Sequence, residues 1–131
     1  MKMKKLILIL LFSTVMFSSS SYAGWTKVLE TDIGDTAYVD FERIREHYGY
    51  VYWWGLTDFL KPTSRGWLSY KIYYQGDCKL FRHKNLSFSF HKEPMGGGTG
   101  RADSYPDEDW TDPAPRSGDK TALELVCDWR E

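Results

Sequence analysis

Alternating hydrophobic and polar positions predict that much of the chain folds as β-strands. The clearest alternation runs from residue 67 to residue 74, where every second side chain is apolar and polar side chains project between them. One face of this strand carries Leu68, Tyr70, Ile72 and Tyr74. Shorter segments at 25–29 and 36–40, and an aromatic segment at 48–59, favour further strands because β-branched and aromatic side chains fit a pleated surface.

The pattern becomes less regular between residues 80 and 115. In residues 80–90, Arg82 and Lys84 intrude on the face that carries the apolar side chains, which predicts an edge strand or a strongly twisted strand. The apolar positions of that face are Leu80, Leu86, Phe88 and Phe90. Residues 96–115 are rich in glycine, acidic residues and proline, so we expect no regular secondary structure there.

One α-helix is predicted near the C-terminus. Ser117-Gly118-Asp119 supplies a capping sequence, and apolar side chains then recur at helical spacing between residues 121 and 129. The positions expected to face the sheet are Ala122, Leu125, Val126 and Trp129. A meander of strands followed by one helix indicates an α+β domain, with a single antiparallel β-sheet of about six strands and a C-terminal α-helix packed on one face.

The first 23 residues have the pattern of a secretory signal peptide. Three lysines precede an apolar run, and Ser21-Tyr22-Ala23 places small residues one and three positions before a cut ahead of Gly24. The apolar run is too short for a comfortable membrane span. We therefore expect residues 1–23 to be a signal peptide and residues 24–131 to form one domain without a transmembrane segment, exported to the periplasm, the cell surface or the medium.

Composition narrows the classes of partner. The 131 residues are 42% hydrophobic and 17% aromatic, which is enough core-forming material for one folded domain. Seventeen Lys and Arg against eighteen Asp and Glu give a formal charge of −1, and loss of residues 1–23 would remove three lysines and no acidic residue. This balance argues against a nucleic-acid partner, since such proteins usually carry a strong positive charge.

Cys78 and Cys127 are the only cysteines in the sequence. In an exported chain, two cysteines allow one intramolecular pairing, so we expect a disulfide that ties the helix to the strand ending near Cys78. A redox-active thiol pair would need a spacing such as C-x-x-C or a local cationic setting, and neither is visible.

Short motifs in order along the mature chain resemble those of the surface-adhesin protein E family. They are Trp25-x-x-Val28, Tyr38-Val39-Asp40 with Ile44-Arg45, Trp54-x-Leu56-x-Asp58-Phe59, Ser69-Tyr70-Lys71, Asp77-Cys78-Lys79, Met95-Gly96-x-Gly98, Trp110 and a terminal helix ending in Val126-Cys127. The resemblance implies a bacterial exported protein with a small antiparallel sheet and a disulfide-tethered C-terminal helix. It also implies adhesion to matrix or plasma proteins such as vitronectin, laminin and plasminogen, and haem binding. The founding adhesin has a lipidated cysteine after its signal, whereas Gly24 stands here, so a periplasmic location is expected as readily as surface display.

The aromatic segment supplies the candidate binding residues. Tyr50, Tyr52 and Trp54 fall on one strand face, while Val51, Trp53 and Phe59 fall on the other. One face is expected to pack under the helix, which leaves the row of Tyr50, Tyr52 and Trp54 on the open side of the sheet. Tyr and Trp are enriched at interface hot spots, so the first face is a candidate surface for a protein partner. The flanking basic residues are Lys71, Lys79, Arg82 and Lys84, which would suit a sulfated polysaccharide or an acidic peptide. The alternatives are that the glycine-rich loop covers this face, or that a second copy covers it in a homodimer.

Two other classes of function remain open from the sequence. A small periplasmic enzyme could use Asp40 and Asp58 as paired carboxylates, provided that the two groups flank a common cleft. A haem carrier could use His91 or Met95 as an axial ligand, although the chain has no C-x-x-C-H motif. The Asp40 carboxyl is also suited to capping a turn or pairing with arginine, which is the commoner role of such a residue.

The histidines and acidic residues do not predict a metal site or another cofactor. His83 and His91 are eight residues apart on what the pattern indicates is one strand face, which separates them by more than about 20 Å in a straight strand. We expect the three histidines to be surface residues. The acidic residues between 103 and 112 match no calcium-binding loop and are expected to be solvated.

Overall fold

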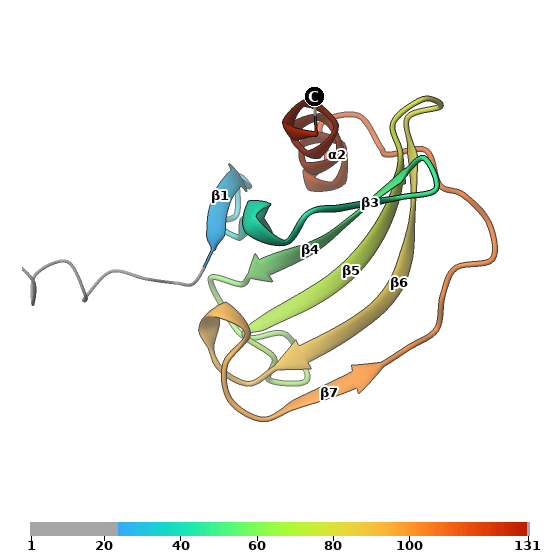
Figure 1. Ribbon diagram of the computed structural model, residues 1–131. Coiled ribbons are helices and arrows are strands. Elements are labelled where there is room, and N and C mark those ends of the chain that lie inside the picture. The colour runs from blue at the N-terminus through green and yellow to red at the C-terminus, as the bar shows by residue number, and fades with distance from the viewer. Residues whose placement is uncertain (1–23, 131) are drawn as a thin grey trace, which may run out of the picture.

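The computed structural model describes residues 24–130 as one antiparallel β-sheet with one α-helix (Figure 1). The helix is α2 (Gly118–Trp129), and the seven strands are β1 (Trp25–Glu30), β2 (Thr36–Asp40), β3 (Arg45–His47), β4 (Tyr50–Asp58), β5 (Ser69–Asp77), β6 (Arg82–His91) and β7 (Gly100–Asp103). The strands pair in the order β1-β2-β4-β5-β6-β7. Strands β2 and β3 lie along the same edge of β4, with β3 paired to the start of β4 and β2 paired to its end. The predicted α+β architecture is confirmed, with seven strands.

Residues 96–115 contain one strand that the sequence analysis did not predict. β7 pairs with Phe88–His91, so the expectation of a wholly irregular segment is wrong and β6 is not an edge strand along that half. The chain reaches this position through the short 3-10 turn η2 (Pro94–Gly96), after which Gly98 adopts a φ of 70° that favours glycine. Beyond β7 the chain runs along the outside of the sheet past β6 and up to α2 (Figure 1).

A β-bulge in β6 changes which of its side chains share a face. Tyr73 pairs with Ser87 and Tyr74 with Asn85, so Leu86 is an extra residue between two ladder pairs. A bulge of this kind interrupts the strict alternation of side chains. The expectation that all apolar positions of this segment share a face with Arg82 and Lys84 is therefore wrong.

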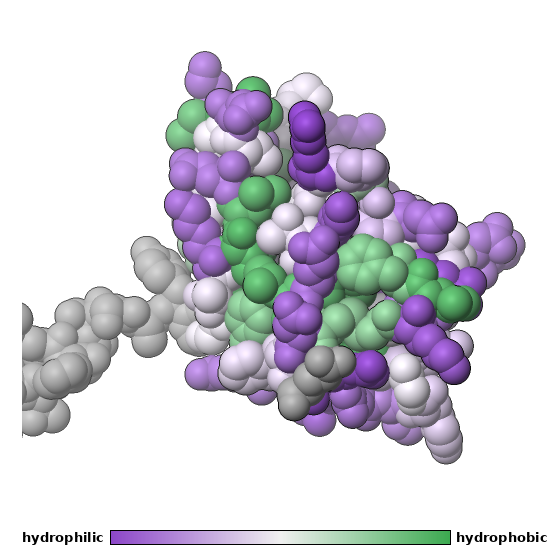
Figure 2. Space-filling model, turned by 90° about the horizontal axis from the view of Figure 1, so that it is seen from above, coloured by the Kyte–Doolittle hydropathy of each residue, from purple (hydrophilic) through white to green (hydrophobic). Residues whose placement is uncertain are grey.

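The core lies between α2 and one face of the sheet. The buried cluster comprises Val39, Val51, Trp53 and Tyr74 from the strands and Ala122, Leu123 and Val126 from the helix. Leu123 is fully buried, whereas Leu125 and Trp129 are 38% and 61% exposed, so the predicted sheet-facing set is wrong at these two positions. Seen from above, hydrophilic residues run along the outer side of α2 and hydrophobic residues flank it (Figure 2).

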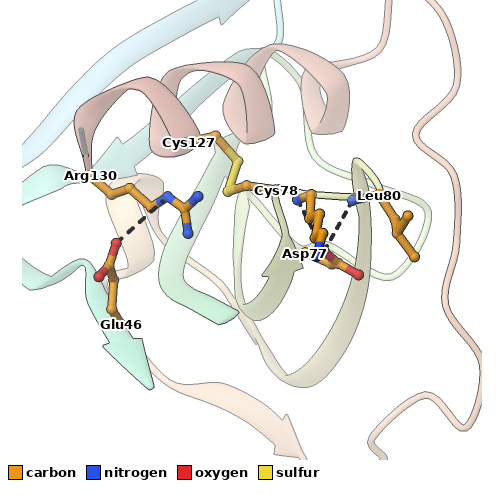
Figure 3. The surroundings of a disulfide bond; sticks show 7 residues. Glu46, Asp77, Cys78, Leu80, Cys127 and Arg130 are labelled. Atoms are coloured by element: carbon orange, nitrogen blue, oxygen red, sulfur yellow. Dashed lines mark hydrogen bonds and ion pairs between the residues drawn. A yellow bond between two sulfur atoms is a disulfide. The ribbon is translucent and has the colours of Figure 1, made fainter. Parts of the chain in front are cut away.

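The two ends of α2 are fixed by different interactions. At the start, the Ser117 hydroxyl oxygen accepts from the Lys120 N–H at 3.1 Å, which is the predicted N-cap. Near the end, the predicted disulfide joins Cys127 to Cys78 in the β5–β6 turn, with the two Cα atoms 5.7 Å apart (Figure 3). The Arg130 guanidinium also lies 3.6 Å from the Glu46 carboxylate of β3. These contacts hold α2 on one face of the sheet, and within residues 24–130 no α-helix lies on the other face.

The predicted signal peptide, residues 1–23, lies outside the described residues. Within residues 24–130, α2 is the one α-helix, and it is neither long nor apolar enough to cross a membrane.

Candidate functional site

The sheet face opposite α2 carries a row of aromatic rings, and we call it the open face. Val51 and Trp53 point into the core beneath the helix, so the alternate β4 residues Tyr50, Tyr52 and Trp54 project from the open face. All three are partly buried rather than fully covered. The structure therefore places the three predicted aromatic residues on one surface.

Tyr73 of β5 completes this aromatic row. Its ring centroid lies 4.8 Å from that of Trp54 and 6.2 Å from that of Tyr52. Burial raises the pKa of the Tyr73 hydroxyl, and the positive charge of Arg45 acts in the opposite direction. Tyr73 was not among the predicted site residues, although the alternation of residues 67–74 places it opposite the face of Tyr70, Ile72 and Tyr74.

Trp110 extends the row from a distant part of the chain. A backbone bridge between His83 and Thr111 positions this segment beside β6. The Trp110 ring centroid then lies 5.2 Å from that of Tyr50. Nothing local in the sequence signals this position, because it depends on pairing between residues 28 positions apart.

Basic side chains lie directly against the aromatic rings. The Lys71 ammonium is 6.0 Å from the centroid of Trp54. The Arg82 guanidinium and the Lys84 ammonium are 4.6 Å and 4.8 Å from the centroid of Trp110. These distances lie within the range of cation–π contacts, so cations border the aromatic row beside Trp54 and beside Trp110.

Two of the predicted basic residues, Lys79 and Arg82, donate hydrogen bonds to the Asp77 carboxylate. Arg82 Nε donates to the Asp77 carboxylate at 3.0 Å, which neutralises its charge locally. Lys79 is exposed in the turn between β5 and β6, where its N–H donates to Asp77. Lys79 thus stands at the border of the open face rather than on it.

A shallow groove with a volume of about 630 Å³ runs beside the aromatic row. It is lined by Arg45, Glu46 and His47 of β3 and by Tyr52 and Tyr73. The residues that β3 contributes were missed by the sequence analysis, because a three-residue strand has too short a pattern to be detected.

The chain itself covers one end of the open face. In the segment around η2, the Met95 N–H donates to the Asp58 carboxylate at 2.9 Å and the Gly96 N–H donates to the Ser69 hydroxyl at 2.8 Å. Ser69 is fully buried as a result. The glycine-rich segment therefore covers this end, while the aromatic row and the groove retain exposed area.

Nearly all of the described residues match a known protein family. The family described as Surface-adhesin protein E matches residues 25–128. The chain belongs to the surface-adhesin protein E family. The comparison with curated protein sequences gives no match.

Solved structures of Haemophilus influenzae protein E have the same fold as this family member. Crystal form II of that protein is 15% identical, with a TM-score of 0.64 over 86% of this chain and 94% of the other. Protein E from non-typeable Haemophilus influenzae is also 15% identical, with a TM-score of 0.58 over 84% of this chain and 79% of the other. At this identity the likeness establishes the fold alone.

The candidate catalytic pair is not assembled in this surface-adhesin protein E family member. Asp58 pairs with Thr36 at one end of β2, whereas Asp40 lies at the other end, about 13 Å away for four extended residues. The buried Asp40 carboxylate accepts from the Glu42 N–H and pairs with Arg43, and Asp58 is engaged by Met95. Both carboxylates therefore stabilise local chain turns, and the hypothesis of a shared cleft is wrong.

The three histidines have different surroundings, and one of them contradicts the sequence-based expectation. His47 is exposed, but His83 is only 5% exposed and faces α2, so it is not a surface residue. His91 is partly buried, and its Nε2 lies 2.7 Å from the Ser89 hydroxyl while its Nδ1 is enclosed. Haem ligation by His91 would require this ring to move. Within residues 24–130, no three His, Cys, Asp or Glu side chains are grouped closely enough to hold a metal ion.

Proposed function

We propose that this chain is an exported, adhesin-like binding protein that recognises a protein or matrix partner through its open face. Membership of the surface-adhesin protein E family supports the adhesin assignment. The observation that carries the choice of surface is the row of partly exposed rings with cations at its border. The binding residues proposed from it are Tyr50, Tyr52, Trp54, Lys71, Arg82 and Lys84, with Lys79 at the edge.

Neighbouring side chains hold the rings of the open face in place. Each ring stacks against a neighbour or a cation, so its orientation is fixed before a partner arrives. A rigid aromatic side chain contributes contact area at little cost in conformational entropy. The groove beside Tyr52 and Tyr73 adds a concave element that could receive a protruding side chain of the partner.

Export forms part of the proposal. Residues 1–23 would direct secretion and be removed before Gly24, and the Cys78–Cys127 disulfide supports an oxidising compartment. Mass spectrometry of the mature protein should give an N-terminus at Gly24. Protease treatment of intact cells would then distinguish surface display, in which the protein is digested, from a periplasmic location, in which it is protected.

A binding assay with matched aromatic variants tests the recognition surface. Residues 24–131 would be applied to immobilised vitronectin, laminin and plasminogen, the partner types implied by the family resemblance. For any partner bound, Tyr73→Ala should weaken binding at least tenfold, whereas Trp129→Ala should change it less than threefold, because Trp129 is 61% exposed at the end of α2, on the other side of the sheet. Failure of all three to bind, or equal loss in both variants, would contradict the proposal.

A second copy of the chain is the alternative occupant of the open face. In that case the protein would elute as a dimer in size-exclusion chromatography with light scattering, and Tyr73→Ala would shift it toward the monomer. A monomer at the concentrations of the binding assay would leave the open face available to another partner. A dimer that Tyr73→Ala dissociates would instead identify the open face as a homodimer interface.

A further inference from the structure

A cavity of about 310 Å³ lies on the helix side of the sheet, beneath the first turn of α2, and has no part in the proposed adhesin surface. Its walls come from β1, β2, β4, β5 and the start of α2, and Figure 1 shows β1 turned up alongside the helix. A cavity of this size is at the lower end of the range for small-molecule sites.

Small residues keep this cavity open. Ala37, Gly55, Gly118 and Ala122 all line it. A Cβ atom at Gly55 would lie 2.8 Å from the Tyr74 ring, so glycine lets that ring lie close over β4. A Cβ atom at Gly118 would meet Leu29 and Ala37 only at 3.6 Å and 3.8 Å, which shows how much space remains there.

The charge of the lining is entirely negative. Asp35 and Asp119 line the cavity, and among its described lining residues there is no lysine, arginine or histidine. The Tyr74 hydroxyl donates to the Asp119 carboxylate at 3.1 Å, and the Leu60 N–H donates to Asp35 at 3.0 Å. His83 Nε2, which lies outside the lining, is 3.9 Å from Asp119. Both carboxylates therefore border a partly enclosed space whose described lining includes no cationic side chain.

Aromatic rings form much of the remaining wall. Phe59, Tyr70 and Tyr74 line the cavity, and the rings of Phe59 and Tyr70 stack with centroids 5.4 Å apart. Burial raises the pKa of the Tyr70 hydroxyl, and the charges of Asp119 and Asp35 raise it further, so both carboxylates act on the same ring. Aromatic faces and carboxylates both attract an ammonium group.

We infer that this cavity is a binding site for a small organic ammonium ion with a short apolar arm. The apolar arm would lie against Val28, Leu29 and the alanines, and the ammonium group would lie among the carboxylates and rings. An anion is disfavoured by the two aspartates, and the helix cap already uses two N–H groups of the first turn, those of Lys120 and Thr121. At about 30 Å³ for each water-sized group, the space fits roughly ten non-hydrogen atoms.

An isosteric ligand series tests the inference on the folded mature chain. n-Butylammonium, n-butanol and butyrate would be titrated separately into isotopically labelled protein and followed by amide NMR. We expect butylammonium to shift the amides of Ala37, Gly55 and Gly118, and to bind at least tenfold more tightly than butanol. Equal affinity for butanol and butylammonium, or shifts confined to other regions, would overturn the inference.

Variants distinguish the cavity from general attraction to an acidic protein. Asp119→Asn should weaken butylammonium binding about fivefold, whereas Glu124→Gln, which removes the same charge from a position of α2 that does not line the cavity, should leave it unchanged. Ala37→Leu should fill the cavity and abolish butylammonium binding. If the Ala37→Leu variant does not fold, the comparison of Asp119→Asn with Glu124→Gln tests the inference. Equal weakening by those two variants would overturn the inference. Because the open face is on the other side of the sheet, adhesin binding is measured independently.

Discussion

Gly76 of β5 lies directly against the core ring of Trp53. A Cβ atom at this position would be 2.6 Å from Cζ3 of Trp53 and 2.9 Å from Leu123. Both neighbours are almost fully buried, so neither can move away without disturbing the contact between sheet and helix. A single hydrogen atom in place of a side chain thus allows the helix to pack closely.

Gly76→Ala is predicted to destabilise the protein by about 1–3 kcal/mol, because it overpacks the core. Urea unfolding followed by circular dichroism measures the change. Gly118→Ala is the matched control, since its added methyl makes ordinary contacts at the start of the helix and should be neutral or slightly stabilising. A Gly76→Ala variant as stable as the wild type would contradict this account of the core.

The Asp77 carboxylate makes part of the stability depend on pH. Burial by itself raises the pKa of Asp77. The N–H groups of Lys79 and Leu80 and the Arg82 guanidinium outweigh it and hold the pKa below its usual value. Figure 3 shows Asp77 beside Leu80. The folded protein therefore binds fewer protons at this site than the unfolded chain does. Its stabilising effect is present above the usual pKa of about 4 and is lost as the pH falls through the folded value.

Asp77→Asn is predicted to lower the free energy of unfolding by about 1–3 kcal/mol at pH 7, because Arg82 loses its carboxylate partner. The difference from the wild type should shrink at pH 3, because the unfolded wild-type chain takes up a proton at Asp77 below its usual pKa of about 4, which reduces the stabilising effect of the carboxylate. Urea titrations at both pH values measure it, with Glu30→Gln as the control for an exposed ion pair. The same difference at pH 3 and pH 7 would exclude this role for Asp77.

Secondary-structure elements with strong local patterns could be predicted from the sequence. The alternation of residues 67–74 corresponds to part of β5, and Ser117 marks the start of α2. The bulge at Leu86 and the strand β7 could not be predicted, because both depend on which residues the neighbouring strand offers. The burial of Leu123 instead of Leu125 was missed as well, because helical spacing alone does not specify which side of α2 contacts the sheet.

The Cys78–Cys127 disulfide, which joins α2 to the β5–β6 turn, should contribute strongly to stability. The disulfide closes a loop between residues 49 positions apart, which in the chain-entropy model stabilises the folded state by about 4 kcal/mol. Replacing both cysteines, Cys78→Ala with Cys127→Ala, should lower the urea midpoint markedly. Dithiothreitol should lower the midpoint of the wild type and have no effect on the double variant. An unchanged urea midpoint in the double variant would show that the disulfide does not stabilise the fold.

In the whole molecule, the two sheet faces have separate roles. The helix side holds the core and the cavity beneath α2, and the open face holds the aromatic row, the cations and the groove. The sequence identified Tyr50, Tyr52 and Trp54 because alternation assigns a face to each β4 residue. Tyr73 and Trp110 join them only in the folded sheet, and Trp110 does so through a backbone bridge to β6 that no local pattern specifies.

The most direct test of the central claim compares two tryptophans on opposite sides of the sheet. Trp54 is on the open face, and Trp129 is 61% exposed at the end of α2 beside Phe41. With a partner identified in the binding assay, Trp54→Ala should raise the dissociation constant at least about thirtyfold, as loss of a hot-spot residue does, and Trp129→Ala less than threefold. A large effect of Trp129→Ala with little effect of Trp54→Ala would place recognition on the helix side and contradict the account.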